Sequence, residues 1–127
     1  MKLHFVASTH AESISRLDAL SQQYGQYSVE EAEVIVVLGG DGQMLHTMRE
    51  SIRHGKPLFG MNCGRVGFLM NDFSDADLLE RIKTAETAPL HPLRLHATDI
   101  SGVTHSAIAI NEVSLLRQTH NAAILQL

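Results

Sequence analysis

The clearest indication of the fold is the stretch at residues 34–42, Val34-Ile35-Val36-Val37-Leu38-Gly39-Gly40-Asp41-Gly42. The first five residues are apolar and mostly β-branched, which is typical of a strand buried on both faces of a parallel sheet. Leu45, Met48 and Ile52, with Met44 beside them, then recur at helical spacing and predict a helix with one apolar face over residues 43–55. A glycine-rich turn therefore joins a buried strand to a helix, and ligands of open α/β sheets bind at such turns.

The glycine turn predicts a phosphate site, because glycine lets a ligand approach the backbone and N–H groups at a helix start attract anions. Two common phosphate fingerprints, G-x-G-x-x-G and G-x-x-x-x-G-K-[ST], do not occur at the turn; Leu45 stands where the first would need its third glycine. Asp41 has two interpretations. It is either the N-cap of the helix, or a carboxylate that orients and deprotonates an attacking hydroxyl beside a bound nucleotide.

Composition excludes several classes of protein. The 127 residues are 44% hydrophobic and 19% charged, which suits one globular domain or slightly more. A net charge of −4 gives no basic surface for nucleic acid, and no apolar run reaches the roughly 20 residues of a membrane helix. Cys63 is the only cysteine, so no disulfide forms within the chain and we expect a cytoplasmic protein. The eight histidines show no metal-ligand spacing.

A second loop accompanies the glycine turn. Strands are predicted at residues 3–7 and 57–61, and capping boxes at residues 9–12 and 74–77 predict two further helices. The loop at residues 62–69 follows the strand at 57–61, so it leaves the same carboxyl edge as the glycine turn. Two such loops from successive strands form a crevice.

The pattern changes after Pro89 and Pro92. Leu93, Leu95 and Ala97 alternate with polar residues and predict a half-buried strand, followed by an extended segment at 104–117. We expect two domains: an α/β nucleotide-binding domain at residues 1–92, and at 93–127 the beginning of an antiparallel β-rich domain. The latter breaks off in the apolar segment 122–127, which predicts that the sequence is a piece of a longer protein.

Three further places are open to two interpretations each. Arg65 either pairs with a phosphate or is solvated, and Phe68 either lines an adenine pocket or packs in the core. Asn111-Glu112 interrupts an apolar run. The pair either faces a ligand or marks a bulge or the end of a strand.

Taken together, three stretches resemble the NAD kinases, which use ATP to phosphorylate NAD to NADP. Gly39-Gly40-Asp41-Gly42 matches the family's G-G-D-G motif. Residues 60–69 are similar to its G-x-N-x-G-x-x-G-F-L stretch, and Asn111-Glu112-Val113-Ser114 resembles its N-E-x-S motif. G-G-D-G alone is shared with phosphofructokinases and with diacylglycerol and sphingosine kinases. The resemblance thus implies a phosphofructokinase-like α/β fold with an open, mainly parallel sheet and flanking helices.

The resemblance also implies roles for single residues. Asp41 would accept the proton of the 2′-hydroxyl of the adenosine ribose, and the turn of Gly39, Gly40 and Gly42 would approach the nucleotide phosphates. The remaining residues implied to contact NAD are His46, Phe68, Asn111 and Glu112.

Two departures from the family pattern accompany the resemblance. Gln43 stands where the family commonly has threonine, and the family's glycine-, threonine- and serine-rich loop, which completes the NAD pocket, does not occur in these residues. The expected substrates are NAD and ATP, with a divalent metal, Mg²⁺, on the phosphates. A homo-oligomer is expected, with neither nucleic acid nor membrane as a partner. The rival hypotheses are another G-G-D-G kinase acting on a lipid or sugar phosphate, and a non-catalytic nucleotide-binding module.

Overall fold

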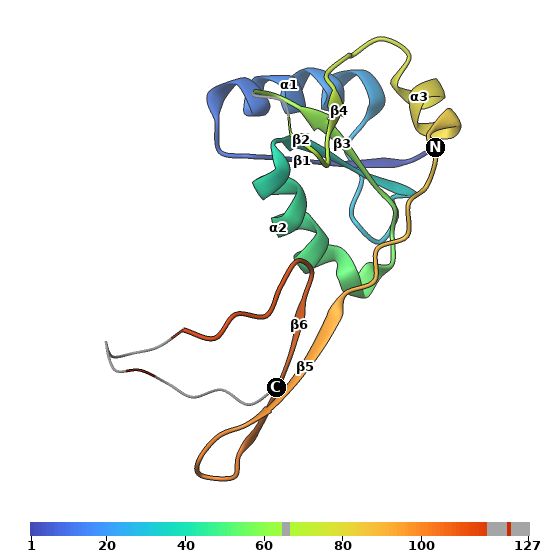
Figure 1. Cartoon of the computed structure of the whole chain (residues 1–127). Helices are drawn as coiled ribbons and strands as arrows, with labels where there is room; N and C mark the ends of the chain where they lie inside the picture. The colour runs from blue at the N-terminus through green and yellow to red at the C-terminus, as the bar shows by residue number, and fades with distance from the viewer. Residues whose placement is uncertain (65–66, 117–121, 123–127) are drawn as a thin grey trace. The chain divides into compact units, whose positions relative to one another are not determined.

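The computed structural model describes residues 1–64, 67–116 and 122, which fall into two compact units at Met1–Leu90 and His91–Leu127. Within the described residues, no helix is long and apolar enough to cross a membrane. The first unit contains, in order, β1 (Leu3–Ala7), α1 (Ala11–Tyr24), β2 (Val34–Gly39), α2 (Asp41–Ser51), the 3₁₀ helix η1 (Ile52–His54), β3 (Leu58–Asn62), β4 (Asn71–Asp72) and α3 (Leu78–Thr84), and the second contains β5 (Leu93–Thr98) and β6 (Thr104–Ala109) (Figure 1).

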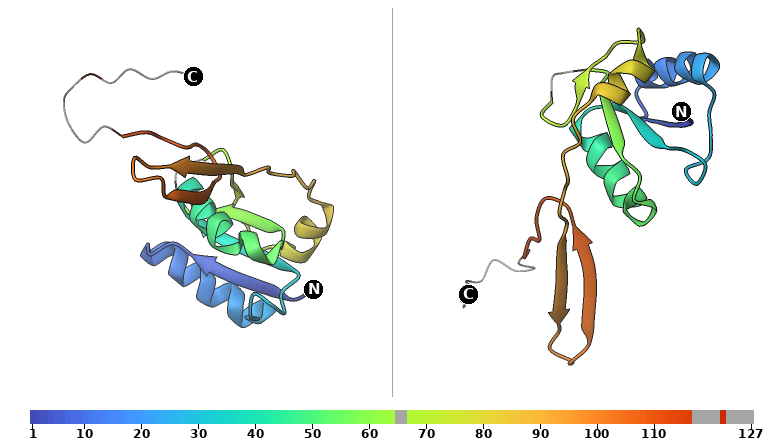
Figure 2. Two further views of the ribbon diagram at one scale, coloured as in Figure 1. Left: turned by 90° about the horizontal axis from the view of Figure 1, so that it is seen from below. Right: turned by 90° about the vertical axis from the view of Figure 1, so that its right-hand side faces the viewer.

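A parallel sheet of order β1-β2-β3-β4 forms the centre of the first unit. All six residues of β2 are buried, as the apolar run predicts. Val34, Val36 and Leu38 pack with α1 and α3 on one face. Ile35 and Val37 pack with Met44 of α2 on the other face, so helices cover both sides of the sheet (Figures 1 and 2). The predicted parallel α/β architecture is confirmed.

The predicted apolar face of α2 is confirmed in part. The helix begins at Asp41, Met44 is buried, and Met48 packs against the same cluster, but Thr47 and Ser51 are buried as well, whereas Ile52 is 41% exposed. The two buried hydroxyls donate back to carbonyl groups of the helix, from Thr47 to Gln43 at 2.9 Å and from Ser51 to Thr47 at 2.6 Å. Because these bonds within the helix satisfy both hydroxyl groups, the side chains of Thr47 and Ser51 can lie against the sheet.

The two predicted capping boxes are wrong. The N-cap residues are His10 for α1 and Asp77 for α3, and neither helix has a side-chain cap bond. Glu12, predicted to cap α1, instead forms an ion pair with Arg16 one turn later. Ser13 is buried and its hydroxyl accepts a hydrogen bond of 2.9 Å from the Ser8 hydroxyl, which fixes the chain between β1 and α1.

The second unit is an antiparallel hairpin. Its register runs from Leu93 opposite Ala109 to Thr98 opposite Thr104, which confirms the antiparallel prediction. The predicted half-burial is wrong, since of the three apolar residues in β5 only Leu95 is partly buried. Strand β6 ends at Ala109, short of the extended segment predicted at 104–117, and the predicted apolar segment at 122–127 lies outside the described residues apart from 122.

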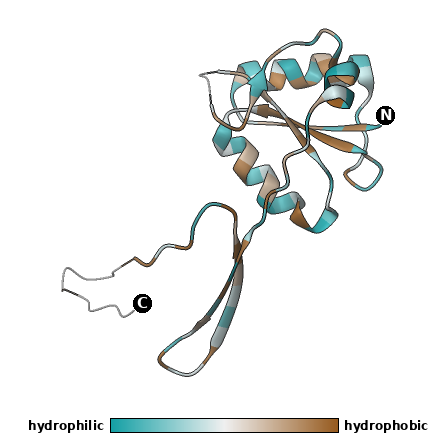
Figure 3. Cartoon of the chain, turned by 45° about the vertical axis from the view of Figure 1, so that its right-hand side comes forward, coloured by the Kyte–Doolittle hydropathy of each residue, from teal (hydrophilic) through white to brown (hydrophobic). Residues whose placement is uncertain are grey.

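Hydrophobic residues recur along the ribbon of the second unit (Figure 3), and the large apolar side chains among them are exposed. They occur in the strands, in the turn and in the segment after β6. They are Leu93, Ile100, Val103, Ile108, Val113, Leu115 and Leu116.

Candidate functional site

The candidate site lies at the carboxyl edge of the parallel sheet. Ala7 of β1 pairs with Leu38, and Gly39 at the end of β2 pairs with Asn62 at the end of β3. Immediately beyond the strands, the Cys63 amide donates to the Gly39 carbonyl at 2.9 Å. The glycine turn and the second loop therefore leave the same edge side by side, as the sequence predicts.

Asp41 joins the two loops directly. Its Oδ2 accepts a hydrogen bond of 2.8 Å from the Phe68 amide, and its Oδ1 accepts one of 3.0 Å from the Leu69 amide. The N-cap position belongs to Gly40, and α2 has no side-chain cap bond, so the N-cap interpretation of Asp41 is wrong. The Asp41 carboxylate accepts hydrogen bonds from the second loop and none from the amides of its own helix. The backbone N–H groups of that loop need such acceptors.

The glycines of the site differ in what surrounds them. A Cβ on Gly39 would lie 2.9 Å from the Cβ of Gln43, and one on Gly67 would collide with the Asp41 carboxylate. In contrast, a Cβ on Gly40 or Gly42 would meet no atom within 4 Å. A side chain at 39 would therefore press on the start of α2, and one at 67 would displace the Asp41 carboxylate or the loop. At 40 and 42 the backbone instead faces open space, where a ligand has room to approach.

The start of α2 offers hydrogen-bond donors to that open space. Its first backbone bond runs from the Met44 amide to the Gly40 carbonyl at 3.1 Å. The amides of residues 41–43 consequently have no acceptor within the helix. Such amides, together with the helix dipole, favour an anion such as a phosphate.

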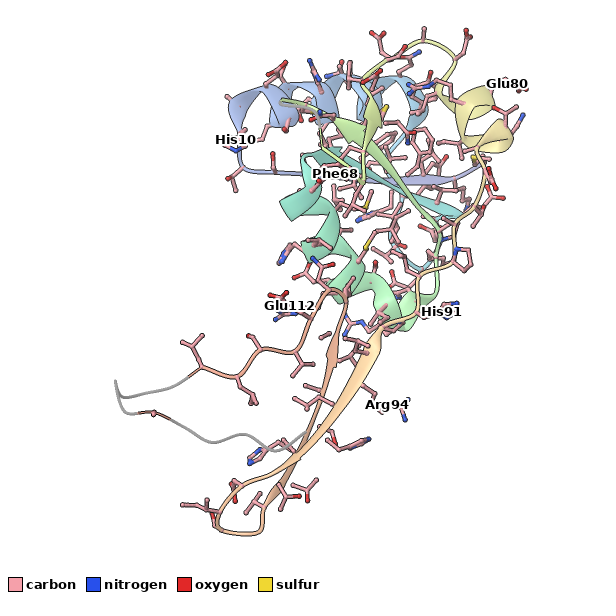
Figure 4. The ribbon with its side chains drawn as sticks, in the orientation of Figure 1. His10, Phe68, Glu80, His91, Arg94 and Glu112 are labelled. Carbon is pink, nitrogen blue, oxygen red and sulfur yellow. The ribbon has the colours of Figure 1, made fainter. Side chains whose placement is uncertain are left out.

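The other residues predicted at the site lie in different surroundings. Phe68 is 102% exposed, so its interpretation as a core residue is wrong; Figure 4 marks it in the loop between β3 and β4. His46 is exposed on α2, with its Nε2 3.2 Å from a Glu50 carboxylate oxygen. Arg65 lies outside the described residues.

Asn111 and Glu112 belong to the second unit. Both are exposed and follow the end of β6, which supports the strand-end interpretation of this pair (Figure 4). That they contact the same ligand as Asp41 stays a prediction.

Arg16 is a residue at this edge that the sequence did not indicate. Its guanidinium lies 3.8 Å from the centre of the Phe73 ring and donates to the Asn62 carbonyl at 3.3 Å, while Glu12 pairs with it from the same helix. It thereby links α1 to the end of β3, where the second loop begins. No motif marks it, because its partners are a backbone carbonyl and a ring distant in sequence.

Metal ligands are few at this edge. Among the described residues, no three His, Cys, Asp or Glu side chains gather closely enough to hold a metal ion. Mg²⁺ bound to nucleotide phosphates needs only one or two protein carboxylates and keeps several waters. Few protein ligands are therefore needed for an ion that arrives with its phosphates.

Comparison with known proteins identifies the family. A family model described as the ATP-NAD kinase N-terminal domain matches residues 7–85. The NAD kinase of Hyphomonas neptunium is 54% identical over 127 residues, which is 100% of this chain and 50% of that protein. The chain belongs to the ATP-NAD kinase family. The NAD kinases of Caulobacter vibrioides and of Xylella fastidiosa are each 48% identical over 126 residues, 99% of this chain and 48% of theirs.

The family assignment covers the candidate site. The matched residues 7–85 run from the end of β1 to just beyond α3 and contain both loops that meet at Asp41. The chain spans about half the length of the curated relatives it matches.

Proposed function

We propose that the natural full-length protein is an NAD kinase, transferring the γ-phosphoryl group of ATP to the 2′-hydroxyl of the adenosine ribose of NAD. One observation carries the proposal: the whole chain aligns with proteins named NAD kinase, one of them at 54% identity. The meeting of the two loops at the Asp41 carboxylate supports it, since phosphoryl transfer depends mainly on positioning and on charge stabilisation.

In this proposal Asp41 is the general base. The ribose hydroxyl oxygen bonds to the γ-phosphorus, the bond from that phosphorus to the β–γ bridging oxygen breaks, and ADP leaves with the electron pair. The hydroxyl proton passes to the Asp41 carboxylate. Each carboxylate oxygen already accepts one amide, but a carboxylate offers about four acceptor positions, so a substrate hydroxyl can still bind.

The glycine turn is the proposed phosphate site. The open space at Gly40 and Gly42 and the donors at the start of α2 support this role. Bound Mg²⁺ would neutralise charge on the transferred phosphoryl group. We propose that His46, Phe68, Asn111 and Glu112 contact NAD, and the full exposure of Phe68 leaves its ring available to an adenine.

Three broader features complete the proposal. The parallel sheet with helices on both faces supports the phosphofructokinase-like superfamily. The free, buried Cys63 supports a reducing cytoplasm, and the expected homo-oligomer rests on the family resemblance alone.

The test uses the natural full-length protein with ATP, Mg²⁺ and NAD, and detects NADP. Parallel reactions offer a lipid diol or a sugar phosphate as acceptor, and binding of NAD is measured separately by calorimetry. NADP formation supports the proposal. Transfer to another acceptor would instead assign another G-G-D-G kinase, and binding of NAD without any transfer would assign a non-catalytic module.

A further inference from the structure

We propose that Gly67, Phe68 and Leu69 form a positioning element for the Asp41 carboxylate, through the backbone of the second loop and not through its side chains. This inference rests on the proposed function of Asp41 as the general base. The second loop would then hold the Asp41 carboxylate in place, in addition to any contact with substrate.

The two hydrogen bonds to the Asp41 carboxylate are the first observation that supports a positioning role. Consecutive amides, from Phe68 at 2.8 Å and Leu69 at 3.0 Å, bond one to each oxygen of the carboxylate. Successive N–H groups of this kind form a concave anion site. Two bonds to two oxygens fix the rotation of the carboxylate as well as its place, and hydrogen bonds to an ionised acceptor are roughly twice as strong as neutral ones.

Gly67 makes the close approach possible. A Cβ at this position would collide with Oδ1 of Asp41 and would lie 2.7 Å from Cγ and 2.9 Å from Oδ2. The three nearest atoms all belong to the same carboxyl group. Any side chain at position 67 must therefore displace the Asp41 carboxylate, the loop, or both.

The positioning element is anchored to the sheet on both sides. Before it, the Gly64 amide donates to Oδ1 of Asn62 at 3.0 Å. After it, Nδ2 of Asn71 donates to the Gly60 carbonyl at 3.0 Å, and Asp72 pairs in register with Asn62. Strands β3 and β4, which pair in register, thus flank the loop that supplies the two amides.

The matched variants are Gly67→Ala and Ser15→Thr in the natural full-length protein. Ser15 is exposed on helix α1 and belongs to neither loop of the site, so Ser15→Thr adds one methyl group without touching Asp41. We expect Gly67→Ala to lower kcat on the order of 10²-fold, with the KM for NAD and ATP little changed, because misplacing a reacting group by about 1 Å costs that much. Ser15→Thr should keep the wild-type kcat.

A second measurement does not depend on activity. Asp41→Asn is nearly isosteric but replaces one acceptor oxygen with an NH₂ group, so it cannot accept from both amides. Hydrogen exchange followed by NMR should show faster exchange of the Phe68 or Leu69 amide in Asp41→Asn than in wild type. This comparison decides the proposal if Gly67→Ala does not fold.

The outcomes separate this inference from the proposed function. A wild-type protein that makes no NADP would refute the kinase proposal, while exchange would still decide whether the two amides hold Asp41. An unchanged kcat in Gly67→Ala, an equal loss in Ser15→Thr, or unchanged exchange in Asp41→Asn would overturn the positioning role.

Discussion

At the scale of single residues, Gly39 and Gly40 are neighbours with different constraints. A Cβ on Gly39 would lie 2.9 Å from the Cβ of Gln43 and 3.2 Å from that of Ser8, whereas Gly40 has open space. We predict that Gly39→Ala lowers the free energy of unfolding by about 1–3 kcal/mol, the usual cost of overpacking. Gly40→Ala should change it by less than about 0.5 kcal/mol. Urea unfolding of both variants measures these free energies of unfolding, and equal values for the two variants would contradict the prediction.

The sequence predicts the position of Asp41 but not its hydrogen-bond partners. The position of Asp41 at the end of a buried strand follows from the apolar run and the glycines. Its partners do not follow, because they are backbone amides of Phe68 and Leu69, which every residue except proline possesses. The glycine at position 67 was the available signal, since only a missing side chain permits that contact.

At the scale of elements, Arg16 connects helix α1 to strand β3. The guanidinium stacks on Phe73 at 3.8 Å and donates to the Asn62 carbonyl at 3.3 Å. Lysine keeps the charge but neither the planar stacking nor the fixed donor geometry. We predict that Arg16→Lys lowers the free energy of unfolding by about 1 kcal/mol. The matched control is Arg49→Lys on the exposed side of α2, and a loss as large in the control would contradict the prediction.

The turn between β5 and β6 provides a pH prediction. Asp99 accepts hydrogen bonds from His105, then from the Ser101 hydroxyl and the Val103 amide, and these lower its pKa from 3.8 to about 2. Because the pKa is lowered in the folded hairpin, the stabilising effect is present above pH 3.8 and is lost as the pH falls through about 2. The Val103 amide shift should follow this titration in NMR spectra. Asp99→Asn should abolish the titration, and a midpoint near 3.8 in wild type would contradict the assignment.

Elements differ in how well their sequence predicts them. Strand β2 is predicted correctly because five consecutive apolar residues need burial on both faces. The capping boxes at 9–12 and 74–77 fail because a cap bond requires one particular backbone geometry, and other contacts prevail here, such as the pairing of Glu12 with Arg16. The buried face of α2 is predicted only in part: Met44 and Met48 pack as expected, but Thr47 and Ser51 are also buried because their hydroxyls are satisfied within the helix.

At the scale of the whole molecule, the two units differ in how they bury apolar residues. The first unit packs two clusters on opposite faces of its sheet. The second exposes large apolar side chains, including Leu115 at 80% and Leu116 at 90%. The alternating pattern of β5 predicts the strand correctly. The burial of its side chains depends on what packs against the hairpin, and the sequence of the strand alone does not predict this.

The proposed role of Asp41 as general base is tested by turnover of Asp41→Asn in the natural full-length protein, with NAD binding measured alongside. Removing a general base typically lowers the rate by roughly 10²–10⁴-fold. We predict a loss of NADP formation on that scale, with the fold and most of the affinity for NAD retained. NADP formation near the wild-type rate would contradict the role of Asp41 and with it the proposed mechanism.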